Sequence, residues 1–203
     1  MTDFLYAIDR QLYLFINSRL ANPVTDILGP FFSGMTSTWY GIAILALLWL
    51  LLFLRGGREG RIVALLIIPV VTFSDQFSST LIKHLVARPR PCHEIGGLPA
   101  AGTVRLLVPC GSGYSFPSSH AVNAFAIAGF VSHYFVRWRL PLILFASAVA
   151  LSRVVVGVHY PSDIAGGAAI GYAVAYTMIF FRWSIETAVG HFRRGKDTGA
   201  EHG

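Results

Sequence analysis

Five long apolar segments divide this 203-residue chain, and they limit its fold more strictly than any other feature of the sequence. A helix needs roughly 20 apolar residues to cross a lipid bilayer, and each segment approaches or reaches that length. The segments are Thr38–Leu54, Ile62–Ile82, Ser118–Val136, Leu140–Val158 and Pro161–Phe181. This pattern predicts an all-α fold, an integral membrane helical bundle with about five transmembrane helices.

The overall composition also favours a membrane protein. Hydrophobic residues make up 54% of the chain and charged residues only 13%, whereas soluble domains carry about 25% charged residues. The formal net charge of +6 is compatible with a nucleic-acid partner. The basic residues, however, lie between the apolar segments, as is typical of membrane topology, so we expect the lipid bilayer and no nucleic acid as partner.

The chain is expected to form a single domain over residues 1–183, followed by a polar, frayed cytoplasmic tail over 184–203. Residues 1–22 predict an amphipathic helix that lies in the membrane interface or packs on the bundle. Its apolar residues recur at helical spacing and are Leu5, Ile8, Leu12 and Phe15. The one long polar connection covers residues 88–116 and is rich in glycine and proline.

The distribution of basic residues predicts the orientation of the chain. Nine of the sixteen lysine and arginine residues lie after the first span, after the third span and at the C-terminus. By the positive-inside rule, these three regions are cytoplasmic. The N-terminal helix, residues 88–116 and the junction between the last two spans are then expected outside a bacterial inner membrane, facing the periplasm.

Three clusters of charged, histidine and serine residues are predicted to meet at that outer surface, because the chain alternates between the two sides of the membrane. Their members are Lys83 and Arg90 after the second span, Ser118, Ser119 and His120 at the start of the third, and Arg153, His159 and Asp163 between the fourth and fifth. The meeting of these residues follows from topology alone.

The chemistry of the clusters points to a phosphate. Lys83, Arg90 and Arg153 form a cationic trio with too few carboxylates nearby to neutralise it, and charge at membrane level is expensive without a partner. A bound anion would neutralise the trio, and a helix beginning at Ser118 adds backbone N–H groups that suit phosphate.

Two histidines add the groups for a reaction. His120 and His159 can transfer protons or attack an electrophile near neutral pH. Asp163, four residues after His159, can hold one imidazole nitrogen as a donor and leave the other free to attack. These residues predict phosphoryl transfer through histidine, with no metal and no other cofactor required.

The three clusters resemble a known signature. Lys83-x6-Arg90-Pro91, then Pro117-Ser118-Ser119-His120, then Ser152-Arg153-x5-His159-x3-Asp163 is similar to the three-part motif of the type 2 phosphatidic acid phosphatase family. That family also includes lipid phosphate phosphatases and vanadium haloperoxidases, and the helical pattern here fits its membrane branch. Ser119 departs from the family pattern, in which glycine is the most frequent residue at this position.

The resemblance implies a role for each residue. His159 would attack phosphorus and form a phosphohistidine, with Asp163 orienting it. His120 would protonate the departing oxygen and then activate water. The residues that would bind the phosphoryl oxygens are Lys83, Arg90, Arg153, Ser118 and Ser119.

The expected activity is therefore metal-independent hydrolysis of a lipid-linked phosphate or pyrophosphate. Similarity to the family makes undecaprenyl pyrophosphate the leading candidate substrate, with undecaprenyl phosphate as the product. Phosphatidylglycerol phosphate, phosphatidic acid and the lipid A 1-phosphate are alternatives, and so is transfer of the phosphate to an acceptor other than water. The motifs recognise only the phosphate that all these substrates share.

Three further residue sets have alternative interpretations. Arg88 is expected either to contact the substrate head group or to face water. Cys92 and Cys110, the only cysteines, both fall in the outward connection, where an oxidising compartment favours a disulfide; two unpaired thiols are the alternative. Asp75 lies about two helical turns below Lys83, and we interpret it as a polar packing contact between helices. The histidine spacings match no recognised metal-ligand pattern, so no metal site is expected.

Overall fold

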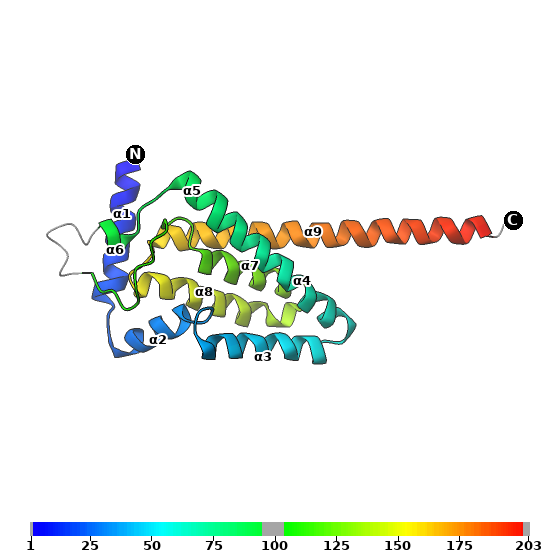
Figure 1. Ribbon diagram of the computed structural model, residues 1–203, viewed down its shortest axis with the longest axis horizontal. Coiled ribbons are helices and arrows are strands. Elements are labelled where there is room, and N and C mark those ends of the chain that lie inside the picture. Colours follow the sequence, from blue (N-terminus) through cyan, green and yellow to red (C-terminus); the bar gives the residue numbers. More distant parts are fainter. Residues whose placement is uncertain (1, 95–103, 201–203) are drawn as a thin grey trace.

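The computed structural model describes residues 2–94 and 104–200, and its side chains over 4–93 and 104–192. Within these ranges the chain folds into helices and contains no strand, so the prediction of an all-α membrane bundle is confirmed (Figure 1). The elements are α1 Thr2–Leu14, η1 Phe15–Arg19, α2 Pro23–Ser33, α3 Trp39–Arg55, α4 Gly57–Gln76, η2 Phe77–Ile82, α5 Lys83–Val86, α6 Pro91–Glu94, α7 Ser119–Tyr134, η4 Val136–Trp138, α8 Arg139–Val155 and α9 Pro161–Ala200.

Each predicted span corresponds to a helical segment. Three segments are long and apolar enough to cross a membrane, namely Gly57–Val86, Val136–Val155 and Pro161–Phe192. The other two are shorter: α3 has 17 residues and α7 has 16. α2 is an additional helix, and it begins with Asn22 as N-cap and Pro23 in the first turn, both typical of helix starts.

The structure differs from the predicted boundaries in two places. α8 ends at Val155, three residues early, and the chain then turns through Gly157, whose φ of 92° suits glycine. α9 does not fray after Trp183 but continues as a helix to Ala200, and Figure 1 shows it extending far beyond the bundle. An Arg182–Glu186 pair at 2.8 Å, one helical turn apart, supports this continuation.

α7 lies at the centre of the bundle, where it packs against α9, α8 and α4. Glycines on α9 allow the closest approach: a Cβ at Gly171 would lie 2.5 Å from the carbonyl oxygen of Val122, and one at Gly167 would lie 3.0 Å from that of Ser118. Small residues at such crossings let helix backbones approach closely. This packing fixes the start of α7 against the start of α9.

The N-terminal helix α1 packs on the bundle in an unexpected orientation. Its apolar residues Phe4 and Ile8 are exposed, whereas Asp9 and Tyr13 of α1 and Asn17 of η1, spaced four residues apart, are buried. Polar side chains therefore face the protein, and apolar ones face outward toward the surroundings. This arrangement suits a helix surrounded by lipid, because the outward face then meets an apolar medium.

Candidate active site

His159 lies in the turn between α8 and α9 and is almost fully buried, with 2% of its surface exposed. Its Nδ1 is 3.5 Å from Oδ2 of Asp163, in the first turn of α9, so the predicted pair faces each other at a distance that is long for a hydrogen bond. Catalytic hydrogen bonds are often long before substrate binds. Burial lowers the pKa of His159 to about 4, against the opposing effect of the Asp163 carboxylate, so the ring is neutral at neutral pH.

Asp163 is held firmly by groups other than histidine. Its Oδ2 accepts hydrogen bonds from the backbone N–H of Tyr160, at 2.7 Å, and from the hydroxyl of Ser115. Its Oδ1 accepts a bond from Arg88 Nη1 at 2.9 Å. The carboxylate is completely buried, and these donors fix its orientation toward His159.

His120, on the first turn of α7, meets the connection between α2 and α3. Its Nε2 is 3.2 Å from the hydroxyl of Thr36, and its ring also hydrogen-bonds the backbone of Ser33. His120 interacts electrostatically with His159, Lys83 and Arg153, so topology brings the two predicted catalytic histidines into one site.

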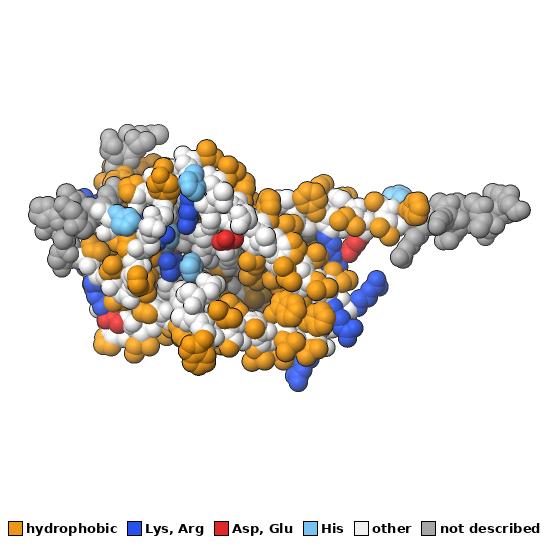
Figure 2. All heavy atoms as spheres, in the orientation of Figure 1, with side chains coloured by type: hydrophobic (Ala, Val, Ile, Leu, Met, Phe, Trp, Pro, Cys, Tyr) orange, Lys and Arg blue, Asp and Glu red, His pale blue; other side chains and the backbone are white. Residues whose placement is uncertain are grey.

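The cationic trio converges on the same place. Lys83 interacts electrostatically with both Arg90 and Arg153, and Arg90 with Arg153. Within the described residues none of the three has a carboxylate within 4.0 Å, whereas Arg88 has two such partners. Figure 2 shows lysine, arginine and histidine side chains gathering on one face, near the end of the bundle where α5 lies.

Hydrogen bonds to uncharged groups position two of these cations. Arg90 is 8% exposed, and its Nε donates to the carbonyl oxygen of Gly113 at 2.8 Å. Arg153 donates from Nη1 to the hydroxyl of Ser33, and its buried Nε has no hydrogen-bond partner within the described part of the chain. Burial lowers the pKa of Arg90, as expected of a cation removed from water without a full counter-charge.

The start of α7 supplies further donors. Ser118 is completely buried, and its hydroxyl has no partner among the described residues. The first backbone N–H groups of a helix have no partner within the helix, and they favour an anion. Ser119 Oγ lies 3.0 Å from Ser79 Oγ, so Ser119 also contacts η2, the helical segment that directly precedes Lys83.

Arg88 lies among internal partners and does not face water as an unpaired surface side chain. It is 16% exposed and pairs with Asp163 and with Asp9 of α1, at 2.9 and 2.7 Å, and its guanidinium stacks 4.1 Å from the ring centre of Tyr160. Burial acts to lower the pKa of Arg88, but the two carboxylates outweigh this effect and raise it. Arg88 is thus an internal partner of Asp163, and its contact with a substrate head group stays a prediction.

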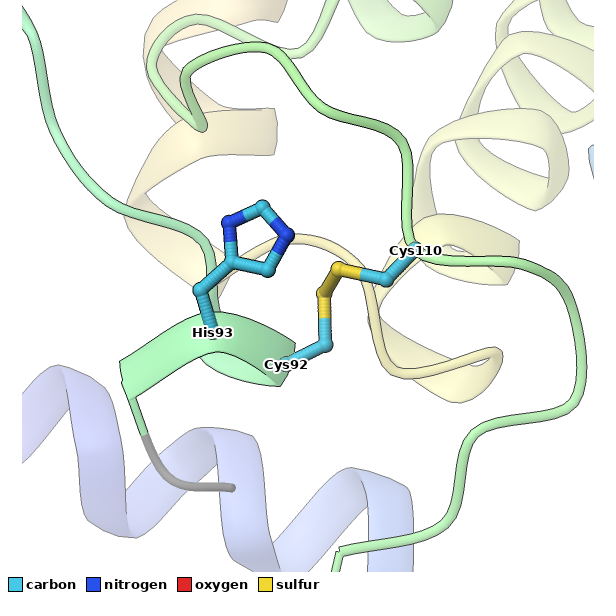
Figure 3. Close-up of side chains that lie close together, drawn as sticks. All are labelled: Cys92, His93 and Cys110. Atoms are coloured by element: carbon cyan, nitrogen blue, oxygen red, sulfur yellow. A yellow bond between two sulfur atoms is a disulfide. The ribbon is translucent and has the colours of Figure 1, made fainter. Parts of the chain in front are cut away.

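Cys92 and Cys110 are joined by a disulfide in the structure, with their Cα atoms 6.2 Å apart (Figure 3). His93 lies beside this disulfide, and the three side chains form a group with metal-ligand spacing. The thiolate is the metal-binding form of cysteine, and the disulfide consumes both thiolates. The bond anchors the chain that carries Arg90 to the stretch that precedes the start of α7.

Asp75 has the environment of an interhelical contact. Its Oδ1 accepts bonds from Asn123 Nδ2 at 3.3 Å and from Ser79 Oγ at 3.4 Å. Ser74 Oγ donates to Asn123 Oδ1 at 2.6 Å, so three polar residues join α4 to α7. The interpretation of Asp75 as polar packing is confirmed.

Several residues that contact the predicted site residues were not predicted for the site, and they include Asp9, Ser33, Thr36 and Ser115. Ser115 lies just before the FPSSH motif, so proximity in sequence is a signal for it. Asp9, Ser33 and Thr36 lie more than 40 residues from the nearest motif, and no local pattern distinguishes them.

Comparison with known proteins matches residues 64–186 to the PAP2 superfamily, a range that includes all three motifs. The chain is 33% identical over 175 residues to a lipid A 4'-phosphatase from Bacteroides thetaiotaomicron, covering 84% of this chain and 75% of that protein. It is 31% identical over 149 residues to the undecaprenyl-diphosphatase BcrC from Bacillus subtilis, covering 72% and 71%.

A solved structure shares the architecture. The crystal structure of Aquifex aeolicus LpxE superposes with a TM-score of 0.67 at 26% identity, covering 83% of this chain and 93% of that one. The matched range, the motifs and the arrangement of helices agree with one another. The chain therefore belongs to the PAP2 superfamily and is a membrane lipid phosphatase.

Proposed function

We propose that this protein removes a terminal phosphate from a membrane lipid through a covalent phosphohistidine at His159. Asp163 holds Nδ1 of His159, so Nε2 attacks phosphorus while the bond to the leaving oxygen breaks, and His120 gives that oxygen a proton. In the second step His120 takes a proton from water, the water oxygen attacks phosphorus, and the bond to His159 breaks.

The observation that carries this proposal is a group of three cations that lie near the two histidines and lack a carboxylate partner in the part of the chain that the structure describes. Lys83, Arg90 and Arg153 each interact electrostatically with His120 or His159, and none has a carboxylate within 4.0 Å among the described residues. Three cations in a site of low dielectric favour the negative charge that spreads over the phosphoryl oxygens during transfer. The unpartnered hydroxyl of buried Ser118 adds an uncharged donor.

The active site is proposed to face the periplasm, with the C-terminus in the cytoplasm. Figure 2 shows basic side chains also at the end of α3 and the start of α4, at the opposite end of the bundle from the site. Those positions include Arg55, Arg58 and Arg61, and the positive-inside rule assigns such clusters to the cytoplasm.

We propose undecaprenyl pyrophosphate as the substrate, hydrolysed to undecaprenyl phosphate. The resemblance to BcrC supports it, and so does a site at membrane level that a lipid can enter from the outer leaflet. A lipid A phosphate monoester is the second candidate, since the Bacteroides relative acts on the 4' position of that class.

The test is release of inorganic phosphate by purified protein from a panel of lipids in mixed micelles. The panel comprises undecaprenyl pyrophosphate, lipid A, phosphatidylglycerol phosphate and phosphatidic acid. We expect kcat/KM to be highest for undecaprenyl pyrophosphate; a higher value for lipid A would select the second candidate. Equal and negligible release from all four would contradict the enzymatic proposal.

Two controls define the reaction. Release of phosphate in the presence of a metal chelator is expected to be unchanged, and strong inhibition would contradict a metal-independent mechanism. Mass analysis of products formed with an added lipid acceptor separates hydrolysis from phosphate transfer, and we expect water to be the acceptor.

A further inference from the structure

The N-terminal helix α1 contributes a buried carboxylate to the surroundings of the active site. Asp9 is 8% exposed, and its Oδ1 accepts a hydrogen bond from the backbone N–H of Ser162 at 2.8 Å. Its Oδ2 accepts from the hydroxyl of Ser162 and from Arg88 Nη2, the latter at 2.7 Å. Asp9 thus contacts the first turn of α9, one residue before Asp163.

Arg88 connects this carboxylate to Asp163. While Nη2 binds Asp9, Nη1 donates to Asp163 Oδ1 at 2.9 Å and to Ser162 Oγ at 2.6 Å. One guanidinium therefore bridges two carboxylates, one on α1 and one on α9. Stacking on the ring of Tyr160 further restricts its position.

The two oxygens of Asp163 have separate tasks in this arrangement. Oδ1 binds Arg88, and Oδ2 faces Nδ1 of His159. Rotation of the Asp163 carboxylate would move Oδ2 away from His159. Because Arg88 binds Oδ1, a fixed Arg88 opposes this rotation. Without Asp9, the half-buried Arg88 would keep a single carboxylate partner and would be free to move toward it.

The next buried side chains along this face, Tyr13 of α1 and Asn17 of η1, bind the turn between α8 and α9 but carry no charge. Tyr13 donates its hydroxyl proton to the carbonyl oxygen of Gly157 at 3.1 Å, and Asn17 Nδ2 donates to that of Val155 at 2.9 Å. Among the residues of α1 that contact this turn, Asp9 is therefore the one that can balance the charge of Arg88.

We propose that Asp9 is a positioning residue for the phosphatase reaction, acting through Arg88 to orient Asp163 and, through it, His159. This inference rests on the proposed role of His159 as nucleophile. It extends the functional unit to α1, which lies outside the residues 64–186 matched by the superfamily. α1 is then part of the catalytic apparatus as well as a lipid-facing helix.

The test compares Asp9→Asn with Asp26→Asn in the full-length protein. Asp9→Asn keeps the shape and removes the charge, and loss of such an outer partner typically lowers activity 10- to 100-fold. We expect this fall in kcat with KM within about threefold, because Lys83, Arg90 and Arg153 keep their places. Asp26 also pairs with an arginine, Arg105 at 2.5 Å, but away from Asp163, so its variant should stay within twofold.

Two inhibitors separate orientation of the nucleophile from general support of the site. Orthovanadate mimics the transition state and requires a placed His159, whereas inorganic phosphate requires only the cations. In Asp9→Asn we expect the inhibition constant for orthovanadate to rise by the same factor as kcat/KM falls, and that for phosphate to change less than threefold. An equal rise for both would overturn the proposal, because it would indicate a purely structural role.

A double-mutant cycle tests the route through Arg88. In an Arg88→Met background, Asp9→Asn is expected to lower kcat much less than it does in the wild-type protein. If the two substitutions lower kcat independently, the proposed route is overturned. If Asp9→Asn does not fold, Asp9→Glu keeps the charge on a longer side chain and should lower kcat without raising KM. Full activity of the Asp9 variants beside an inactive His159→Ala would reject this inference alone, whereas an active His159→Ala would reject the proposed function.

Discussion

The two halves of the candidate active site differ in whether their charged side chains are paired with opposite charges. On one side, the half-buried Arg88 pairs with two buried carboxylates, Asp163 and Asp9, each at 2.9 Å or less. On the other side, Lys83, Arg90 and Arg153 have no carboxylate within 4.0 Å among the described residues. We call the first group, together with His159, the orienting half and the three cations the receptive half. The charges of the orienting half are paired within the protein, whereas those of the receptive half can pair with a bound anion.

This difference shows how a buried site can hold His159 and Asp163 in fixed positions and still bind an anion. A buried charge is destabilising unless it is paired, so pairing on the orienting side allows His159 and Asp163 to stay fixed in the interior. On the other side, a bound phosphate would offset the cost of leaving three cations unpaired. In the proposed mechanism, the residues that act on phosphorus are thus separate from the residues that bind its oxygens.

Removal of the nucleophile should have the largest effect and would test the orienting half. His159→Ala is expected to lower kcat by at least about 10⁴-fold and to abolish trapping of a radiolabelled phosphoenzyme. Phosphate release and acid-quenched labelling measure both. His133→Ala, which changes an exposed histidine on α7, should retain wild-type activity and label. Labelling of the His159→Ala protein would contradict the assignment of the nucleophile.

Removal of a cation from the receptive half should have the next largest effect. Arg153→Ala is expected to lower kcat/KM by about 10²- to 10³-fold, since one donor to the developing charge is lost. Arg105→Ala removes an arginine that already has a carboxylate partner, Asp26, and should change kcat/KM less than threefold. Similar losses in both variants would remove the distinction between paired and unpaired arginines.

The disulfide should affect the receptive half more weakly. Replacing Cys92 and Cys110 together by serine opens a loop with a sequence separation of 18, which lowers the free energy of unfolding by up to about 3 kcal/mol. Because Arg90 lies two residues before Cys92, we expect KM to rise several-fold with little change in kcat. Thermal unfolding in detergent and steady-state kinetics test this; a main effect on kcat would place the disulfide with the orienting half.

The smallest effect concerns pH and the buried imidazole. The pKa of His159 is about 4 in the folded protein and 6.5 when unperturbed, so the unfolded chain takes up a proton first as pH falls. His159 therefore contributes stability that is fully present above pH 6.5 and is lost as pH falls toward 4. We expect Tm to fall by a few °C over this window, and by less in His159→Gln. An unchanged pH dependence in that variant would contradict burial of a neutral ring.

The chemistry of the site was largely predictable from the sequence, because it resides in short motifs of fixed spacing. Lys83 and Arg90 on one segment, and His159 and Asp163 on another, can be recognised without knowing the fold. Alternation of spans across the membrane then brings the motifs to one side. The partners of Arg88 could not be predicted, since Asp9 lies 79 residues away in the chain.

By itself, the sequence determined that this chain is a helical membrane protein of a lipid phosphatase family, because apolar length and motif spacing are local properties. Only the tertiary structure decided which face of α1 is buried. Helical periodicity shows that Phe4 and Tyr13 lie on opposite faces of α1, but it does not show which face meets the protein. In lipid the apolar face of α1 can turn outward without cost. The polar face then packs on the protein where Asp9 pairs with Arg88.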